Sequence, residues 1–228
     1  MTSEQTRRDF MRKGLAILVS AAIPAFAQSE EPTSQPGKKV VVLDPGHGMG
    51  NRKKGVYDPG AVHEKIYEEK IVLDQSKRVG KILAQKGYDI ISTRTDSETE
   101  TPLSSRPILA NQQNADIFVS LHCNAFTNPD AKGVRTYHYP DTKQGIKLAR
   151  QVQDSLVEEL TANIPGFEQK YNGLKTANFH VLKHTNMPAV LVESGFLTNE
   201  RDRKYLTQNP EIVAEGIDKG IIKYLEEE

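Results

Sequence analysis

Two histidines and one glutamate each come shortly after a run of apolar residues. They are His47, His122 and Glu193, which come after the runs 40–43, 116–121 and 189–192. Continuous apolar runs of this length predict buried strands. In open α/β sheets, ligands bind at the carboxyl ends of parallel strands. The three side chains are therefore expected to converge on one crevice.

A fourth acidic residue, Glu69, opens a helix that is predicted after a stretch rich in Gly and Pro. A carboxylate at this position is stabilised by the positive end of the helix dipole. Two imidazoles and one carboxylate, with an open fourth position, form a known catalytic zinc set. We therefore predict that His47, Glu69 and His122 bind Zn²⁺. Glu193 is then the general base and acid of a hydrolytic reaction.

Neighbouring acids compete with Glu69 for the role of ligand. Glu68 precedes it directly, and helix starts are uncertain by one or two residues, so Glu68 stays open as the alternative. His63 and Glu64 imitate a ligand pair, but they lie in the loop before the helix and are expected to be solvated.

Three further histidines are weighed as ligands and set aside. His138 falls in a predicted strand and is expected to be half-exposed. His180 and His184 are four residues apart, a spacing that suits a metal only on a helix. The alternation around Phe179 and the nearby Pro188 argue against a helix there, so both are expected in a loop or at the rim of the site.

The predicted elements follow one another in the order of an α/β domain. Strands are expected at 40–43, 88–93, 116–121, 134–139 and 189–192. Helices are expected from 68 or 69 to about Gly87, from 104 or 105 to 114, and at 142–160, 199–206 and 210–228. Apolar strands that alternate with helices predict a single domain with a mostly parallel, mixed central sheet and helices on both faces. The run 134–139 alternates in polarity and is expected nearer an edge.

The N-terminus predicts export to the periplasm or cell wall. Arg7-Arg8 precede a short apolar run, and an A-x-A pattern ends at Ala27, so residues 1–27 are expected to be a signal peptide of the twin-arginine type. The apolar run is too short to span a bilayer core of about 30 Å. Residues 28–38 are expected to be a flexible leader, and 39–228 the catalytic domain.

Composition excludes some classes of partner. The chain has 30 basic and 30 acidic residues. The predicted signal holds four of the basic and two of the acidic ones, which leaves a net charge of −2. Nothing in this balance favours nucleic acid or an anionic membrane. Cys123 is the only cysteine, so no disulfide can form within the chain.

Several stretches carry a family resemblance in an unbroken order. They are 42–48 (VLDPGHG), 58–61 (DPGA), 69–70 (EK), 93–94 (TR), Arg106, 110–111 (AN), 115–125 (ADIFVSLHCNA) and 187–199 (MPAVLVESGFLTN). Through them the chain resembles the zinc-dependent N-acetylmuramoyl-L-alanine amidases of the type-3 amidase family. The resemblance covers essentially the whole predicted domain.

The resemblance implies a function and a role for each site residue. Zinc is held by His47, Glu69 and His122, Glu193 is catalytic, and the fold is one α/β domain. Glu69 is preferred to Glu68 because the residues that follow it continue as in the family. The reaction is hydrolysis of the amide between N-acetylmuramic acid and L-alanine in peptidoglycan or muropeptides. The alternatives are another exported zinc amidohydrolase or peptidase, and a non-catalytic cell-wall-binding regulator.

Two departures from the family pattern matter. Cys123 stands where a small apolar residue is usual, and its side chain is expected to be a buried, inert thiol on the face opposite His122. Some periplasmic members carry an inserted helix that blocks the zinc until an activator displaces it. The segment between residue 139 and Glu193 leaves little room for such a helix, so an open site is expected. An activator that the sequence does not identify is left open.

Some polar and aromatic residues allow two interpretations. Arg94 and Arg106 either face the acidic stem peptide or form ion pairs within the domain. Asn124 either touches the substrate or belongs to a turn. Tyr137 and Tyr139 either line a sugar groove or pack on the sheet.

Overall fold

The computed structural model describes residues 37–169 and 173–228. The predicted signal peptide and nearly all of the predicted leader lie outside the described residues. The part of the chain that is described belongs to one compact unit, Ser34–Glu228. No helix in this part is long and apolar enough to cross a membrane.

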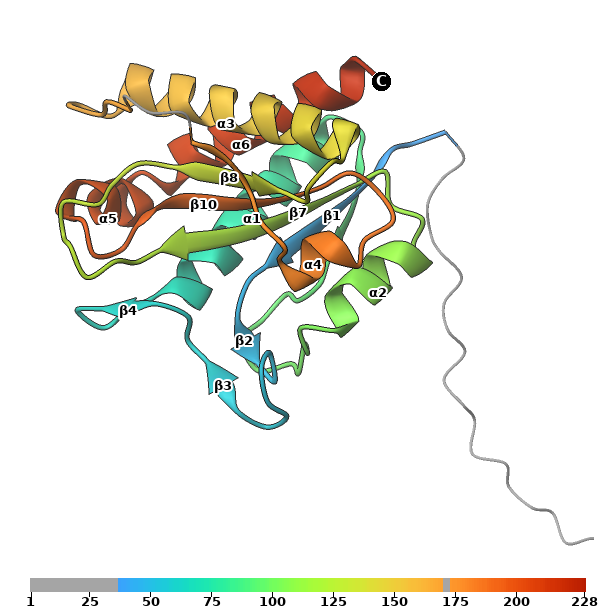
Figure 1. Ribbon diagram of the computed structural model, residues 1–228, viewed down its shortest axis with the longest axis horizontal. Coiled ribbons are helices and arrows are strands. Elements are labelled where there is room, and N and C mark those ends of the chain that lie inside the picture. The colour runs from blue at the N-terminus through green and yellow to red at the C-terminus, as the bar shows by residue number, and fades with distance from the viewer. Residues whose placement is uncertain (1–36, 170–172) are drawn as a thin grey trace, which may run out of the picture. The chain divides into compact units, whose positions relative to one another are not determined.

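A six-stranded mixed sheet forms the centre of this unit (Figure 1). Its order is β6 (Asp89–Ser92), β1 (Val40–Pro45), β7 (Ile117–Asn124), β10 (Ala189–Phe196), β8 (Arg135–His138) and β9 (Leu174–Thr176). The first four strands are parallel, and β8 pairs antiparallel with β10. The predicted mostly parallel, mixed sheet is therefore confirmed. β8 lies one strand from the edge, which is formed by the unpredicted β9.

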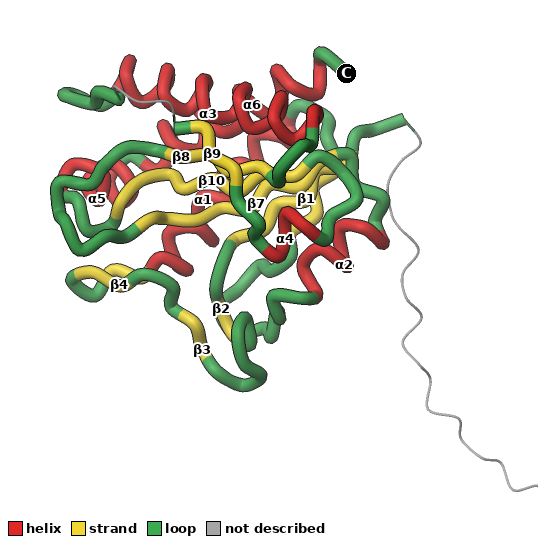
Figure 2. Tube along the Cα trace, viewed as in Figure 1, coloured by secondary structure: helices red, strands yellow, loops and turns green. Residues whose placement is uncertain are grey.

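Helices cover both faces of the sheet (Figures 1 and 2). One face packs against α1 (Glu68–Gln85), α3 (Lys143–Asn163), α5 (Glu200–Gln208) and α6 (Pro210–Glu226), and the other against α2 (Ser105–Gln112) and α4 (His180–Lys183). Two small hairpins precede α1: β2 (Gly48–Met49) with β3 (Tyr57–Asp58), and β4 (Val62–His63) with β5 (Ile66–Tyr67).

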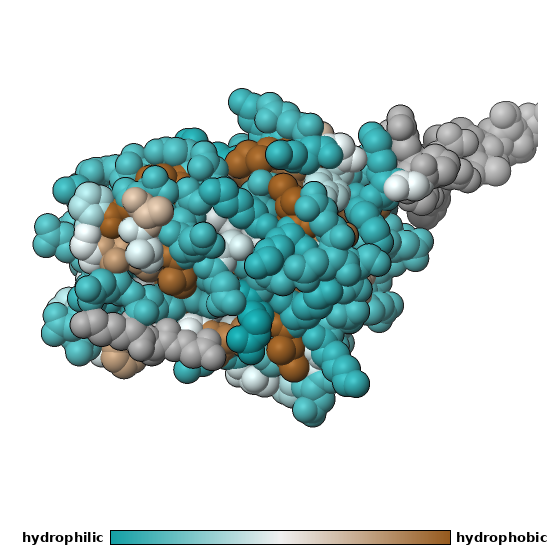
Figure 3. All heavy atoms as spheres, turned by 90° about the horizontal axis from the view of Figure 1, so that it is seen from above, coloured by the Kyte–Doolittle hydropathy of each residue, from teal (hydrophilic) through white to brown (hydrophobic). Residues whose placement is uncertain are grey.

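Burial on both faces explains why the strand sequences are apolar without alternation. In β1, Val41 and Leu43 enter the core beneath α1, α3 and α6, whereas Val40 and Val42 enter the smaller core beneath α2 and α4. Each side chain of the strand is thus removed from water, and a polar residue on either face would lose its solvation. Seen from the α3 side, the surface is mainly hydrophilic, with hydrophobic side chains in small separate groups (Figure 3).

Two expectations about local structure are corrected. The strands β7 and β10 do not end before His122 and Glu193 but continue to Asn124 and Phe196. Residues 180–183 do form a short helix, α4, because Pro188 lies beyond it and leaves its hydrogen bonds intact.

A buried ion pair fixes the loop that follows β1. The Arg106 guanidinium donates to Asp44 Oδ1 at 2.7 Å, to the carbonyl of Pro45 at 2.9 Å and to the carbonyl of His47 at 2.6 Å. Thr93 and Ser120 hydroxyls donate to the same carboxylate. Burial alone would raise the pKa of Asp44, but Arg106 and the two hydroxyls outweigh it and hold that pKa below its usual value.

We predict that Arg106→Met lowers the free energy of unfolding by about 3–5 kcal/mol at pH 7, because it leaves a buried carboxylate uncompensated. In the wild type, the stabilisation from Asp44 is complete above about pH 4 and is lost as the pH falls through the lowered folded-state pKa. In the variant, burial raises that pKa, so the penalty shrinks when Asp44 becomes protonated.

Urea unfolding of the metal-free protein at pH 7 and pH 4 measures this difference. Arg150→Met, on the exposed side of α3, is the matched control and is expected to change stability little. A penalty for Arg106→Met that stays the same at both pH values would contradict the pairing.

Candidate metal centre

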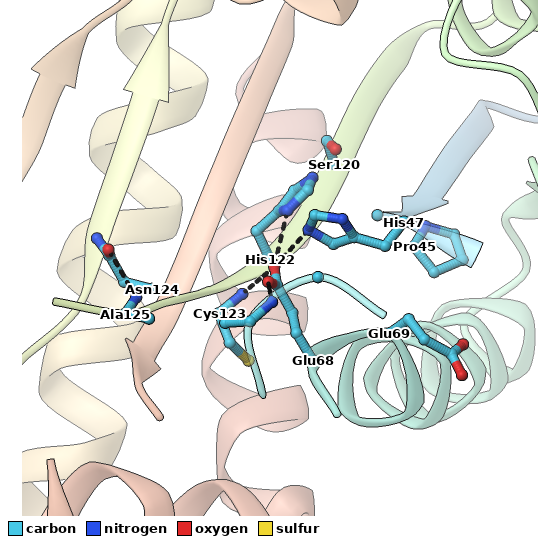
Figure 4. Close-up of polar contacts among 12 residues, drawn as sticks. Pro45, His47, Glu68, Glu69, Ser120, His122, Cys123, Asn124 and Ala125 are labelled. Atoms are coloured by element: carbon cyan, nitrogen blue, oxygen red, sulfur yellow. Dashed lines mark hydrogen bonds and ion pairs between the residues drawn. The ribbon is translucent and has the colours of Figure 1, made fainter. Parts of the chain in front are cut away.

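Two imidazoles and one carboxylate meet at the carboxyl ends of β1 and β7 (Figure 4). Oε1 of Glu68 lies 3.0 Å from Nε2 of His47 and 2.9 Å from Nδ1 of His122. The three side chains come from the loop after β1, from β7 and from the first residue of α1. Among the described residues, they are the one group of at least three His, Cys, Asp or Glu side chains arranged to hold a metal ion.

The carboxylate at this meeting point is Glu68 and not the predicted Glu69. Successive residues of a helix point about 100° apart, so only one of the two can face the histidines. Glu68 lies four residues before Val72, on the face of α1 that packs on the sheet. Figure 4 shows the Glu69 carboxylate pointing away from the histidines. The helical spacing back from Val72 was the sequence signal that favours Glu68.

Glu69 instead belongs to a buried network beside the centre. Its carboxylate accepts hydrogen bonds from the Tyr57 hydroxyl at 2.5 Å, the Ser97 hydroxyl at 3.0 Å and the Arg94 guanidinium at 3.3 Å. Arg94 also donates to the carbonyls of Pro45 and Gly46. Glu69 therefore stabilises the arginine that fixes the backbone immediately before His47.

Backbone geometry and a second carboxylate orient His47. Its φ is 62°, in the left-handed region that few non-glycine residues adopt. Asp58 Oδ2 lies 3.1 Å from His47 Nδ1, and Asn51 donates to the same oxygen at 2.7 Å. A carboxylate on Nδ1 leaves Nε2 free for a metal and makes the imidazole a better ligand. The sequence reasoning used Asp58 only as part of a family motif and missed this role.

Close packing of glycine holds the second imidazole in place. A Cβ on Gly46 would lie 2.2 Å from Cε1 of His122, so this position admits no side chain. The backbone N–H of Cys123 donates to Glu68 Oε1, which ties the carboxylate to β7. The Cys123 side chain enters the core on the other face of the sheet, and burial raises the pKa of its thiol. The predicted burial of this thiol is confirmed.

Glu193 lies beside His122 on the neighbouring strand. The two residues are register partners in the parallel pair β7–β10, so their side chains emerge on the same face. Both line a cavity of about 490 Å³ together with His47 and Glu68. Burial raises the pKa of the Glu193 carboxyl to about 7, against the opposing effect of the histidines. Its buried Oε2 has no hydrogen-bond partner among the described residues.

The residues that converge here fit a zinc ion. Tetrahedral zinc with ligands at about 2.0–2.1 Å holds its ligand atoms about 3.3 Å apart. The separations of 3.0 and 2.9 Å around Glu68 Oε1 are close to this value, and all three ligand atoms lie within 4.8 Å of one another. Two nitrogen donors, one carboxylate oxygen and an adjacent cavity match a three-ligand catalytic site with an open position.

The remaining candidates lie elsewhere or have structural roles. Glu64 is in the turn of the β4–β5 hairpin, and its Oε2 lies 3.5 Å from Nη2 of Arg203. His138 is buried rather than half-exposed, and its Nδ1 lies 2.9 Å from the Tyr139 carbonyl. His180 lines the cavity, and the centroid of its ring lies 4.4 Å from that of His184.

The open alternatives among the polar and aromatic residues are also resolved in part. Arg94 and Arg106 are buried in ion pairs within the domain, and Arg106 also lines the cavity. Asn124 is the last residue of β7, its side-chain oxygen accepts from the Ala125 N–H, and it lines the cavity. Tyr137 and Tyr139 pack on the core beneath α2 and α4.

The chain was compared with known proteins on this basis. The sequence profile of the N-acetylmuramoyl-L-alanine amidase family matches residues 41–223. The chain belongs to this family. The amidase AmiC2 of Nostoc punctiforme is similar in structure, with a TM-score of 0.72 and 34% identity over 83% of this chain and 98% of that one. The CwlD amidase of Clostridioides difficile was solved in complex with the GerS lipoprotein. Its TM-score is 0.74 and its sequence identity 28%, over 84% of this chain and 100% of that one.

Among curated relatives, the N-acetylmuramoyl-L-alanine amidase LytC of Bacillus subtilis is 31% identical over 188 residues. The match includes 82% of this chain and 35% of LytC, so the amidase chain described here spans about a third of that relative's length.

Two single substitutions separate the roles of the adjacent glutamates. We predict that Glu68→Gln lowers zinc affinity by about 100-fold or more, because it removes the charged ligand. Glu69→Gln is expected to keep one zinc per chain and to lose up to about 3 kcal/mol of stability, because it weakens the buried pair with Arg94. Metal analysis after dialysis, chelator competition and urea unfolding measure the two effects. A folded Glu69→Gln protein that has lost its zinc would restore Glu69 as the ligand.

Proposed function

We propose that this chain is a zinc-dependent N-acetylmuramoyl-L-alanine amidase, with His47, Glu68 and His122 as metal ligands and Glu193 as the catalytic residue. One observation carries the proposal: the Glu193 side chain lines the same cavity as the three residues whose ligand atoms lie within 4.8 Å of one another. Membership of the amidase family supports the choice of bond. The substrate is the amide that joins the lactyl group of N-acetylmuramic acid to L-alanine in peptidoglycan or muropeptides.

A bound zinc ion supplies a Lewis acid that polarises the amide carbonyl and makes water acidic enough to attack at neutral pH. Glu193 accepts a proton from the attacking water as the new C–O bond forms. It then delivers that proton to the alanine nitrogen as the C–N bond breaks. The products are the lactyl carboxylate and a free α-amino group on L-alanine.

Two other functions remain as alternatives. A zinc amidohydrolase or peptidase with another substrate would use the same groups, since a fold does not fix the substrate. A non-catalytic cell-wall-binding regulator is disfavoured because no ligand and no catalytic group has been replaced. The chain spans a minor part of LytC, so LytC's own activity is only supporting evidence.

Export and regulation also belong to the proposal. Residues 1–27 are proposed to be a twin-arginine signal, on the pattern of paired arginines, short apolar run and A-x-A site. An open site is supported by the two helices between residue 139 and Glu193. The helix α3 packs against α6 in the larger core, and α4 has only four residues, so neither is a long helix placed over the cavity. The CwlD–GerS complex makes a protein activator a reasonable further proposal for this chain.

Digestion of purified sacculi tests the reaction. The metal-loaded protein is expected to release stem peptides with free L-alanine amino groups from intact glycan strands, and a chelator is expected to stop release. Mass spectrometry of the soluble products, with labelling of new amino termini, measures both. New reducing sugar ends, or cleavage only at D-amino acid bonds, would overturn the amidase proposal.

Glu193→Gln is the matched control for this experiment. It keeps the shape of the side chain and removes its ability to accept a proton. We expect one zinc per chain and a loss of turnover of about 10²–10⁴-fold. Loss of the metal in this variant would show that Glu193 is a ligand rather than the base.

A further inference from the structure

A short basic loop borders the cavity of the metal centre. The β2–β3 hairpin carries Arg52, Lys53 and Lys54 in succession, and all three side chains are exposed. Arg52 and its neighbour Asn51 line the same cavity as His47, Glu68 and Glu193. The reaction described above does not use these basic residues.

The loop is anchored, so its charges occupy a defined place. Gly50 donates to the carbonyl of Val56 across the hairpin at 3.0 Å. The neighbouring segment holds the N-terminal side of the loop: Thr101 donates to the carbonyl of Met49, and Leu103 donates to that of Asn51. The Glu100 carboxylate accepts from the Gly55 N–H at 2.6 Å. These bonds limit the entropy that a ligand would have to remove on binding.

Arg52 has donor capacity that the protein does not use up. Its Nε lies 3.2 Å from Asp58 Oδ2, yet the side chain keeps 75% of its surface exposed. Asp58 is shared with His47 and Asn51, so it neutralises Arg52 only in part. The guanidinium fork matches a carboxylate through two parallel hydrogen bonds.

The other charges around the cavity are balanced within the site. Asp44 is paired with Arg106, and Arg94 is buried against Glu69. Glu68 and Glu193 offset a divalent ion once it is bound. Arg52 is the cation of the basic loop that lines the cavity, and Lys53 and Lys54 follow it in the hairpin. The acids beside the loop are Asp58, 3.2 Å from Arg52, and Glu100, which accepts from Gly55. Such an arrangement favours an anionic ligand.

We propose that Arg52, assisted by Lys53 and Lys54, forms a subsite for a carboxylate on the stem-peptide residue that follows L-alanine. The inference rests on the proposed function and specifies which stem peptides the enzyme prefers. An extended chain advances about 3.3–3.6 Å per residue. The residue after the alanine therefore lies close to the scissile amide, within reach of a side chain that lines the same cavity. A peptide with a free carboxylate there binds better than its carboxamide.

Two matched substrates test the subsite. They are N-acetylmuramoyl-L-Ala-D-Glu peptides that differ only in having a free carboxylate or a carboxamide on the second residue. The zinc-loaded wild type is expected to show a kcat/KM about tenfold higher for the carboxylate, a preference that weakens with added salt. In Arg52→Gln the ratio of the two kcat/KM values is expected to fall to about 1. The ratio removes any general effect of the substitution on the metal centre.

Two variants serve as controls for charge and position. Arg52→Lys keeps the charge without the fork and is expected to retain part of the preference. Arg150→Gln, on the exposed side of α3, is expected to leave the ratio unchanged. Equal cleavage of both substrates by the wild type would overturn the subsite and leave the amidase intact. A preference that survives in Arg52→Gln would also overturn it. Cleavage of neither substrate would contradict the amidase and the subsite together.

Discussion

A single carboxylate oxygen joins the parts of the chain that make up the site. Oε1 of Glu68 meets both imidazoles and also accepts from the backbone N–H of Cys123, while Oε2 accepts from the N–H of Ala61. The start of α1, the loop after β1, the end of β7 and the segment before β4 are thereby held together. Burial opposes the charge, but the two histidines outweigh it and keep the pKa of Glu68 well below its usual range. A buried anion held by these four groups is stable only while they stay in place.

Two buried arginines keep the surrounding backbone in place. Arg106 and Arg94 bind the carbonyls of Pro45, Gly46 and His47, and each is compensated by one buried carboxylate, Asp44 or Glu69 respectively. The left-handed turn at His47 persists because these carbonyls are fixed on both sides of it. The ion pairs thus act on the direction of an imidazole and not only on stability.

Much of the fold followed from the sequence because burial leaves a clear pattern. Strands covered on both faces have to be apolar throughout, so the runs at β1, β7 and β10 were found, and α1 showed its helical stripe. The small hairpins and β9 were missed because two or three residues carry too little periodicity. The short helix α4 was rejected because of the alternation around Phe179 and the nearby Pro188, and its four residues form one turn with no repeat to set against these signals.

In the site, residue type was predictable but the direction of a side chain at a helix start was not. His47, His122 and Glu193 line one cavity as predicted, although β7 and β10 continue beyond His122 and Glu193. Glu68 and Glu69 differ only in direction, and matching the letters Glu69-Lys70 to a motif gave the wrong one, whereas the spacing to Val72 gives the right one. The sequence did not predict the contact of Asp58 with His47 or the place of Arg52 beside the cavity. Both depend on the fold of the β2–β3 hairpin, which no local pattern encodes.

The most direct test of the account is a crystal structure of the zinc-loaded protein with anomalous data collected on both sides of the zinc absorption edge. The account predicts one strong anomalous peak per chain, about 2.0–2.2 Å from Nε2 of His47, Oε1 of Glu68 and Nδ1 of His122. It also predicts that the Glu69 carboxylate stays with Arg94 and that Glu193 stands near the peak without touching it. A peak coordinated by Glu69, or no peak between the two histidines, would contradict it.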